Sequence, residues 1–127
     1  MEICKFDKFK DFPEVREWHR MRGQEIKATR LPSTGWIVHG VAACFCYHDK
    51  TSTLGFIHGL ISNPKADTKE VYEAVIKMFE QGERDCRDNQ IEVVVFTTKL
   101  NSIEKIAEKI GYQKDEDKAS VLVRQFQ

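Results

Sequence analysis

The side chains best suited to metal binding are Cys44, Cys46 and His48, which form a Cys-x-Cys-x-His run. Cysteine and histidine are the usual ligands of structural zinc. The run lies in a strand-like segment, however, and alternate residues of a strand advance by about 6.6 Å per pair. Three such residues span more than one tetrahedral site allows, so we predict no metal site. We interpret the cysteines as small buried side chains, and expect free thiols in a reducing cytosol.

The strands that must position any other site are indicated by β-rich runs. WIVHG, VAACFCYH and TLGFIHGLIS follow one another between residues 36 and 62, separated by Gly40 and by the polar stretch HDKTST. This pattern predicts an antiparallel meander. IEVVVFT, residues 91–97, is almost entirely β-branched or apolar, which predicts a central strand covered on both faces. Further strands are expected at 2–10 and 120–126.

One segment has a strong helical period. Between residues 68 and 88, apolar residues recur at three- and four-residue steps, and opposite charges lie four residues apart on the other side. A helix here, between the strands of residues 54–62 and 91–97, predicts a right-handed parallel β-α-β unit. The expected fold is therefore α/β, with a mixed twisted sheet made of the antiparallel meander and this unit, and with helices on both faces.

Two more helices are expected. Asp11, with Pro13 and Glu14 after it, predicts a helix start, and the first helix is placed at 12–22. A second amphipathic stripe over 103–110 follows possible caps at Asn101 or Ser102 and ends at Gly111. Residues 24–35 are polar and contain Pro32 and Gly35, which predicts an irregular connection able to shape a pocket wall. The whole chain, 1–127, is predicted to be one domain.

Composition excludes several function classes. Lys and Arg number 20, as do Asp and Glu, so the formal charge is zero. A neutral chain has no long-range attraction to a polyanion, so we expect no nucleic-acid and no membrane partner. No apolar stretch approaches the roughly 20 residues that cross a bilayer, and the first residues alternate in charge where a signal peptide is apolar. We therefore expect a cytoplasmic protein.

Four local sequences, in order, carry a resemblance to a known family: GVAACFCY, TLGFIHGLISNP followed by the long helix, IEVVVFT, and NSIEKIAEKIGY. They resemble the third strand, the fourth strand, the fifth strand and the late helix of the GNAT superfamily of acetyl-CoA-dependent N-acetyltransferases. The resemblance covers nearly the whole chain. RLP, GW and GVAA ahead of a strand ending in Asn-Pro are also similar to compact acetyltransferase-like proteins of phages.

The resemblance implies where a site would lie. In the family, two strands splay apart and their open amides hold the acetyl-pantetheine arm, which here implies the backbone of Leu60, Ile61 and Ser62. Aligning Asn63-Pro64 with the family's strand ending places His58 where many members carry a proton-relaying acidic residue. Histidine side chains titrate near pH 6.5 and can take that role. The alternative is a half-buried strand histidine that a neighbouring carbonyl satisfies. The acceptor amine would lie near Arg30, Trp36 or His19, although for His19 the favoured alternative is that it faces water.

The chain departs from the family at the turn that binds the cofactor's pyrophosphate. The family's turn carries two small residues, mostly glycine, whose amides approach the phosphates. Here Asp67 falls at the position of the usual arginine and Glu70 at that of the first glycine. The two carboxylates could instead form an Asp-x-x-Glu helix cap. The groups left to bind the cofactor would be Lys65, Lys69, Glu70 and Val71, the last three through N–H groups expected to be available.

A second departure is Ala107, which falls where many members have the tyrosine that protonates the leaving thiolate. Tyr112 takes the aromatic position after Gly111, a packing role. Thiols ionise near pH 8.5, so the loss of this acid would slow the reaction without forbidding it. His39 and His48 lie near strand ends and are expected to be solvated.

Two functions follow from these residues. The first is an N-acetyltransferase that moves an acetyl group from the co-substrate acetyl-CoA to a primary amine, either of a small molecule or of a protein lysine or N-terminus. The second is a catalytically inactive GNAT-fold protein that acts as a protein-binding module. The missing glycines favour the second, whereas the strand order and His58 favour the first. In either case the expected state is a monomer or a homodimer.

Overall fold

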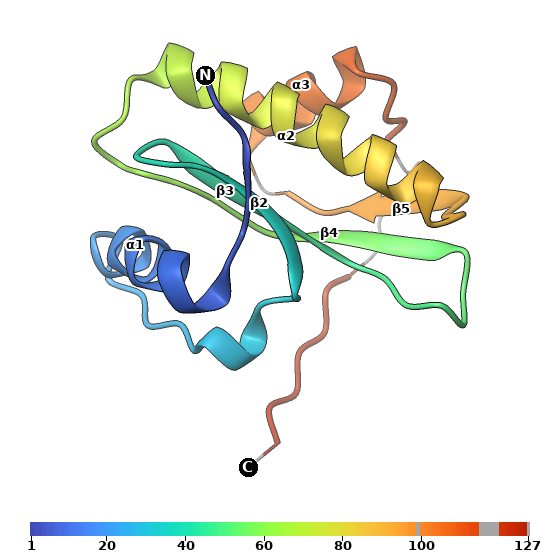
Figure 1. Ribbon diagram of the computed structural model, residues 1–127, viewed down its shortest axis with the longest axis horizontal. Helices are drawn as coiled ribbons and strands as arrows, with labels where there is room; N and C mark the ends of the chain where they lie inside the picture. The colour runs from blue at the N-terminus through green and yellow to red at the C-terminus, as the bar shows by residue number, and fades with distance from the viewer. Residues whose placement is uncertain (99, 115–119, 127) are drawn as a thin grey trace. The chain divides into compact units, whose positions relative to one another are not determined.

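In the computed structural model a five-stranded sheet forms the centre of residues 1–97 (Figure 1). In spatial order the strands are Cys4–Lys5 (β1), Thr34–Val38 (β2), Ala42–Tyr47 (β3), Leu54–Ser62 (β4) and Val93–Phe96 (β5). Neighbours from β1 to β4 are antiparallel, and β4 and β5 are parallel. The predicted meander and mixed sheet are confirmed. The structure describes residues 1–98, 100–114 and 120–126.

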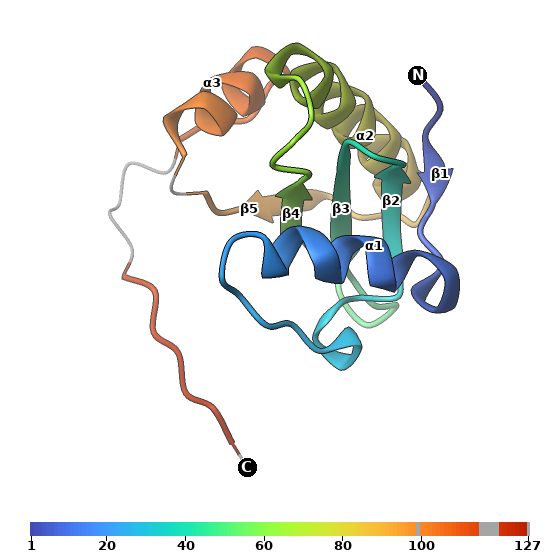
Figure 2. The same cartoon turned by 90° about the vertical axis from the view of Figure 1, so that its left-hand side faces the viewer.

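Helices α1, Lys8–Arg20, and α2, Thr68–Asp88, cover opposite faces of this sheet (Figure 2). The predicted helix 68–88 is confirmed, because its apolar stripe is buried and the Asp67 side chain caps its first turn. The arrangement with helices on both faces is confirmed as well. The core on the α1 face is built from Phe6, Val15, Trp18, Leu31, Ile37, Ala43, Phe45 and Ile61.

The first helix begins four residues earlier than predicted. Asp7, not Asp11, lies at its N-cap and accepts hydrogen bonds from the Phe9 and Lys10 N–H groups at 2.8 and 3.2 Å. The Asp11 carboxylate is buried, and it accepts the Asp7 N–H at 2.8 Å. The two carboxylates therefore cap the helix reciprocally. Pro13 lies inside the helix rather than at its start.

Three predicted strands are shorter, displaced or missing. The strand expected at 2–10 is reduced to β1, because the helix takes over from Lys8. The strand expected at 120–126 is not formed, and its apolar side chains are exposed. With no strand beyond it among the described residues, β5 is an edge strand and not the central one. Val93 and Val95, which share one face of the strand, are exposed, so the prediction that β5 is covered on both faces is wrong.

The described residues after Thr97 form a second compact unit, so the single domain stays a prediction. Its helix, Asn101–Lys109 (α3), begins after Leu100, and no side chain caps it, so the caps predicted at Asn101 or Ser102 are wrong. The predicted end is confirmed, because Gly111 has a φ of +108° and the Tyr112 N–H bonds the Ala107 carbonyl at 3.0 Å. No helix of the described residues is both long and apolar enough to cross a membrane.

Candidate active site

The β4 strand extends well beyond its pairing with β5. The parallel ladder joins Leu54–Ile57 to Val93–Phe96, whereas β4 continues to Ser62. In the described part of the chain, the β5-side edge of residues 58–62 therefore has no strand partner. These residues include Leu60, Ile61 and Ser62, whose backbone the resemblance implies for a thioester contact. The arrangement leaves this edge without a neighbouring strand where that contact would be made, although the Ser62 carbonyl is bound by Arg22.

A bulge in β4 accompanies the end of this ladder. Phe45 of β3 pairs with His58, whereas Ala43 pairs with Ile61, so Gly59 and Leu60 together oppose one β3 residue. Gly59 has a φ of +70°, a conformation that L side chains rarely adopt. The glycine is needed for a second reason, because a Cβ there would lie 3.1 Å from Cδ2 of Phe45.

Arg22 fixes the end of β4 to the end of α1. Its guanidinium donates to the Ser62 carbonyl at 2.5 Å, to the Ser62 hydroxyl at 3.0 Å and to the Trp18 carbonyl at 3.2 Å. Partial burial lowers the pKa of Arg22 from its usual value, because desolvation disfavours the charged form. The Ser62 carbonyl and hydroxyl are therefore held by the protein itself. Arg22 could not be predicted from the sequence, because no local pattern relates it to a residue forty positions later.

His58 lies in a cavity of about 420 Å³ on the α1 side of the sheet. Its strand neighbours Tyr47 and Phe56 pair across β3 and β4 and form one wall. The opposite wall is the short 3-10 turn Ala28–Arg30 (η1) together with Leu31 and Pro32. Residues 24–35 therefore do shape a pocket wall, as predicted.

The His58 ring is exposed in this cavity and has no hydrogen-bond partner in the described residues. The alternative prediction, in which His58 is half-buried and bonded to a neighbouring carbonyl, is therefore wrong. An exposed imidazole in a concave site can exchange protons with a ligand. Arg30, predicted near the acceptor, lines the same cavity.

Two other residues predicted near the acceptor lie elsewhere. Trp36 is buried on the α2 face, where its Cζ3 lies 3.5 Å from the position of a Cβ at Gly82. His19 is half-buried on α1, and its Nδ1 lies 3.1 Å from Oε1 of Gln24. The structure therefore does not bring either residue among those that line the His58 cavity. Tyr47 and Phe56, which the sequence analysis did not single out, take their place.

Main-chain N–H groups of the turn after β4 donate hydrogen bonds to acceptors of the chain itself. The side chain of Asn63 accepts the Lys65 N–H at 2.9 Å, and its carbonyl accepts the Ala66 N–H at 3.0 Å. At the start of α2, the Lys69 N–H donates to the Asp67 carboxylate at 3.0 Å. The Val71 N–H donates to the Asp67 carbonyl at 3.0 Å. The expectation that the amides of Lys69 and Val71 are available is therefore wrong.

Asp67 and Glu70 place two carboxylates in this first turn of α2. A helix N-terminus favours an anion, and the Asp67 carboxylate already meets that preference. The predicted helix-cap role of Asp67 is confirmed. A diphosphate would have to approach these carboxylates and would find few free amides, so the residues present do not fit this part of coenzyme A.

Cys44, Cys46, Cys86 and His48 lie in the packed layer between β3 and α2, outside the His58 cavity. His48 is mostly buried rather than solvated, and its Nε2 lies 3.4 Å from Oδ2 of Asp85 in α2. The Sγ atoms of Cys46 and Cys86 lie 3.8 Å apart in the same layer, while burial raises the pKa of Cys44 to about 12. No group of three or more such ligands is positioned for a metal ion among the residues described.

His39 is exposed, as predicted, and it is also paired with α1. Its Nδ1 lies 2.9 Å from the Glu14 carboxylate and its Nε2 lies 3.8 Å from that of Asp11, which joins the β2–β3 turn to α1. The hydrogen bond with Glu14 raises the pKa of His39. The pair lies outside the His58 cavity, and we interpret it as a structural link.

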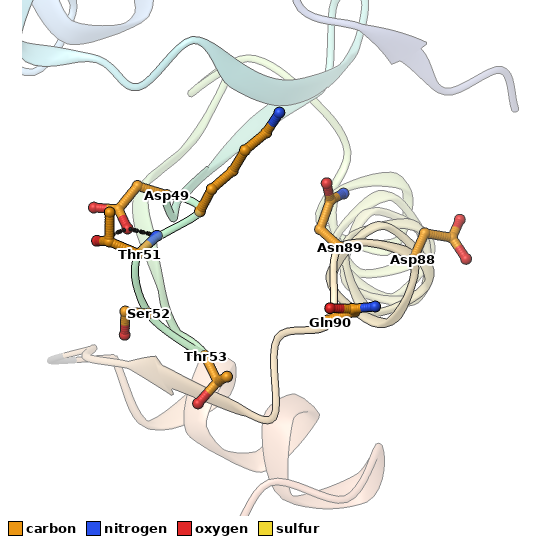
Figure 3. Close-up of a pocket in the computed structure, with 8 residues that line it drawn as sticks. Asp49, Thr51, Ser52, Thr53, Asp88, Asn89 and Gln90 are labelled. Atoms are coloured by element: carbon orange, nitrogen blue, oxygen red, sulfur yellow. Dashed lines mark hydrogen bonds between the residues drawn. The ribbon is translucent and has the colours of Figure 1, made fainter.

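A second, more polar cavity of about 720 Å³ lies between residues 49–53 of the β3–β4 connection and residues 88–90 after α2 (Figure 3). The Asp49 carboxylate accepts the Thr51 N–H and hydroxyl, which stabilises the turn and lowers the pKa of Asp49. The described residues that line this cavity include no histidine or cysteine to carry a proton or act as a nucleophile. We therefore take the His58 cavity as the candidate active site.

Comparison with known proteins shows the fold. The chain is similar to a point mutant of TTHA1254 from Thermus thermophilus, with a TM-score of 0.74, 9% identity and all of both chains covered. A crystal structure of a probable acetyltransferase gives a TM-score of 0.70 at 10% identity, covering 100% of this chain and 99% of the other. A predicted acetyltransferase of Clostridium acetobutylicum, solved with acetyl-CoA, gives 0.63 at 14% identity, with 95% of each chain covered.

At these identities the likeness establishes the fold alone. No protein-family model matches the sequence, and no curated protein does. The chain has the α/β fold of the GNAT-like acetyltransferases, as the resemblance predicted. One fold can host many unrelated functions, so the function of this chain depends on the residues of its own site.

Proposed function

We propose that this chain transfers an acyl group from a thioester to a primary amine. The observation that carries the proposal is His58, an exposed imidazole without a protein partner in the described residues, in a cavity beside the unpaired edge of β4. Amine acylation needs a proton acceptor, because an ammonium has no lone pair with which to attack. It also needs main-chain or side-chain donors that orient the acyl carbonyl.

His58 would accept the proton that the ammonium loses, directly or through one water. The adjoining backbone of Leu60 to Ser62 would orient the acyl carbonyl through the edge groups that β5 leaves unpaired. Arg22 would hold Ser62 in place during this step, since it already binds both polar groups of that residue. A thioester such as acetyl-CoA would supply an acyl carbon with a thiolate leaving group.

The donor we propose is held by its pantetheine arm more than by its phosphates. The amides of Lys65, Ala66, Lys69 and Val71 all donate within the chain, and Asp67 and Glu70 add negative charge near them. Of the residues named for the phosphates, only the side chains of Lys65 and Lys69 would offer positive charge. We expect the diphosphate to contribute little to affinity.

A direct experiment compares acetyl-CoA with S-acetylpantetheine, which has the same thioester but no diphosphate. With a panel of primary amines as acceptors, release of free thiol measures the rate. We expect turnover with both donors and KM values within about tenfold of each other, since one lost phosphate interaction of about 1.4 kcal/mol gives that factor. A much larger preference for acetyl-CoA would contradict the account of the turn.

The role of His58 is tested by His58→Gln, which keeps a polar side chain but cannot carry a proton at neutral pH. Turnover should fall by about 10²- to 10⁴-fold, the usual worth of a general base. The matched control is His39→Gln, outside the cavity, which should leave turnover unchanged. Equal loss in both variants, or in neither, would remove His58 from the mechanism.

The second candidate is a protein-binding module with the same fold. It is favoured by the turn after β4, whose amides and carboxylates leave no evident phosphate site among the described residues. Calorimetry distinguishes the two functions. Heat at micromolar to millimolar S-acetylpantetheine or acetyl-CoA supports a transferase, whereas no heat with either thioester at millimolar concentration leaves only the binding module.

A further inference from the structure

The His58 cavity has an aromatic wall that a proton acceptor alone does not need. Tyr47 and Phe56 are direct cross-strand partners, and they remain 58% and 42% exposed. Leu31 and Pro32 face the same space from the other wall. Large apolar side chains left in contact with water inside a concave site are typical of ligand binding. A bound molecule with an apolar body would cover them.

The charge of the cavity is the second observation. Arg30 is the only permanently charged side chain in its lining, and no carboxylate is among the lining residues that the structure describes. Arg30 is exposed, and its side chain has no ion-pair or hydrogen-bond partner in the described residues. A free guanidinium favours a carboxylate, which it can bind through two parallel hydrogen bonds.

This charge distribution discriminates among amines. A polyamine or an amino sugar carries several positive charges and needs carboxylates around it, whereas here it would meet Arg30 instead. A lysine side chain of a protein presents its amine at the end of an apolar stem, with no anion of its own nearby. An α-amino acid carries both an amine and a carboxylate, so it offers an anion to Arg30 and an amine to His58 within the one cavity that both residues line.

We propose that the acceptor is a free α-amino acid with a large apolar or aromatic side chain. Its carboxylate would bind Arg30, its side chain would pack on Tyr47 and Phe56, and its amine would face His58. The cavity of about 420 Å³ lies within the range of small-molecule sites. This inference rests on the proposed acyl transfer for its chemistry, although binding of the acceptor can be measured without any donor.

The test titrates the protein, without a thioester, with three probes followed by NMR chemical shifts: L-phenylalanine, phenethylamine and spermidine. Phenethylamine keeps the aromatic ring and the amine but lacks the carboxylate. We expect L-phenylalanine to bind at least about tenfold more tightly than phenethylamine, because phenethylamine has no carboxylate to accept charge-assisted hydrogen bonds from Arg30. Spermidine should bind most weakly.

Two variants assign the difference to named groups. Arg30→Met should remove the preference for L-phenylalanine over phenethylamine, while the control Arg16→Met, an exposed arginine of α1 outside the cavity lining, should retain it. Tyr47→Ala should weaken both aromatic probes and leave their ratio unchanged. A preference that survives Arg30→Met would overturn the proposal, as would tighter binding of spermidine or no binding of L-phenylalanine.

The transfer assay separates this inference from the proposed function. Turnover with spermidine but not with L-phenylalanine would leave acyl transfer standing and overturn the acceptor class. Arginine-dependent binding of L-phenylalanine without turnover on any amine would support the binding site and refute acyl transfer.

Discussion

Replacing Gly59 with alanine tests the bulge that shapes β4 at the candidate site. Gly59 has a φ of +70°, and an added Cβ would lie 3.1 Å from Cδ2 of Phe45 and 3.5 Å from Cδ2 of Leu31. Phe45 is fully buried and packs edge-on against Phe6, with ring centroids 4.7 Å apart. It therefore has little room to move away.

Two costs add in this variant. The left-handed backbone costs an L residue about 1–2 kcal/mol. Forcing a methyl group against a packed core ring costs about 1–3 kcal/mol more. The matched control is Gly23→Ala, because Gly23 has a φ of +71° and a Cβ added there would meet nothing within 4 Å. We expect the control to lose about 1–2 kcal/mol in the free energy of unfolding and Gly59→Ala to lose about 2–5 kcal/mol.

Urea unfolding followed by the fluorescence of Trp18 and Trp36 measures both values by linear extrapolation. In the background of Phe45→Leu, a smaller ring-free side chain, the excess loss of Gly59→Ala over Gly23→Ala should shrink, which gives a positive coupling between positions 45 and 59. Losses that agree within about 0.5 kcal/mol in the original background would refute the contact between Phe45 and the bulge.

Three further predictions concern single contacts and thiols. Arg22→Lys keeps the charge but loses the planar guanidinium that binds Ser62 and Trp18, so the free energy of unfolding should fall by about 0.5–1.5 kcal/mol. The control Arg16→Lys should leave the free energy of unfolding unchanged, and an equal value for the two variants would show that the guanidinium is not needed. The raised pKa of His39 stabilises the fold below pH 6.5, its unfolded value, and this contribution is lost as the pH rises through the folded value. Over that pH range the native protein should therefore lose up to about 1 kcal/mol more free energy of unfolding than Glu14→Gln does, a small value because the His39 side chain is 52% exposed. If the free energies of unfolding of the two proteins change in parallel with pH, the His39–Glu14 pair does not contribute. Under native conditions a thiol reagent should modify half-buried Cys4 first, with buried Cys44, Cys46 and Cys86 protected; Cys4→Ser should remove the fast phase, and its persistence would mean that a buried thiol is accessible.

The sequence predicted α2 to the residue because independent signals agree there. The apolar stripe and the i,i+4 charge pairs indicate the same helix, and the capping side chain of Asp67 marks its start. At α1 the signals compete, since Asp7 and Asp11 are both suitable caps and only tertiary packing decides that Asp11 is buried. The periodicity of 91–97 indicated a strand, but no local pattern states whether a neighbour will pair with its outer edge.

Some residues of the site could be predicted from the sequence and others could not, because their positions depend on how the strands pair. His58 and Arg30 line one cavity, whereas Trp36 does not, because the face to which a strand residue points depends on register. Tyr47 and Phe56 became neighbours through a connection of six residues whose geometry the sequence does not fix. Their exposure on the face shared with His58 follows only once that register is known.

The turn after β4 shows how one set of groups can serve stability or binding but not both. Asp67 contributes about 1 kcal/mol as an N-cap by taking the Lys69 N–H, and in doing so it puts an anion where a phosphate would bind. Neutralising it with Asp67→Asn keeps the capping acceptor and removes the charge. If acetyl-CoA then binds more tightly while S-acetylpantetheine does not, the carboxylate is what repels the diphosphate; if neither changes, the amides already engaged within the chain are the limiting feature.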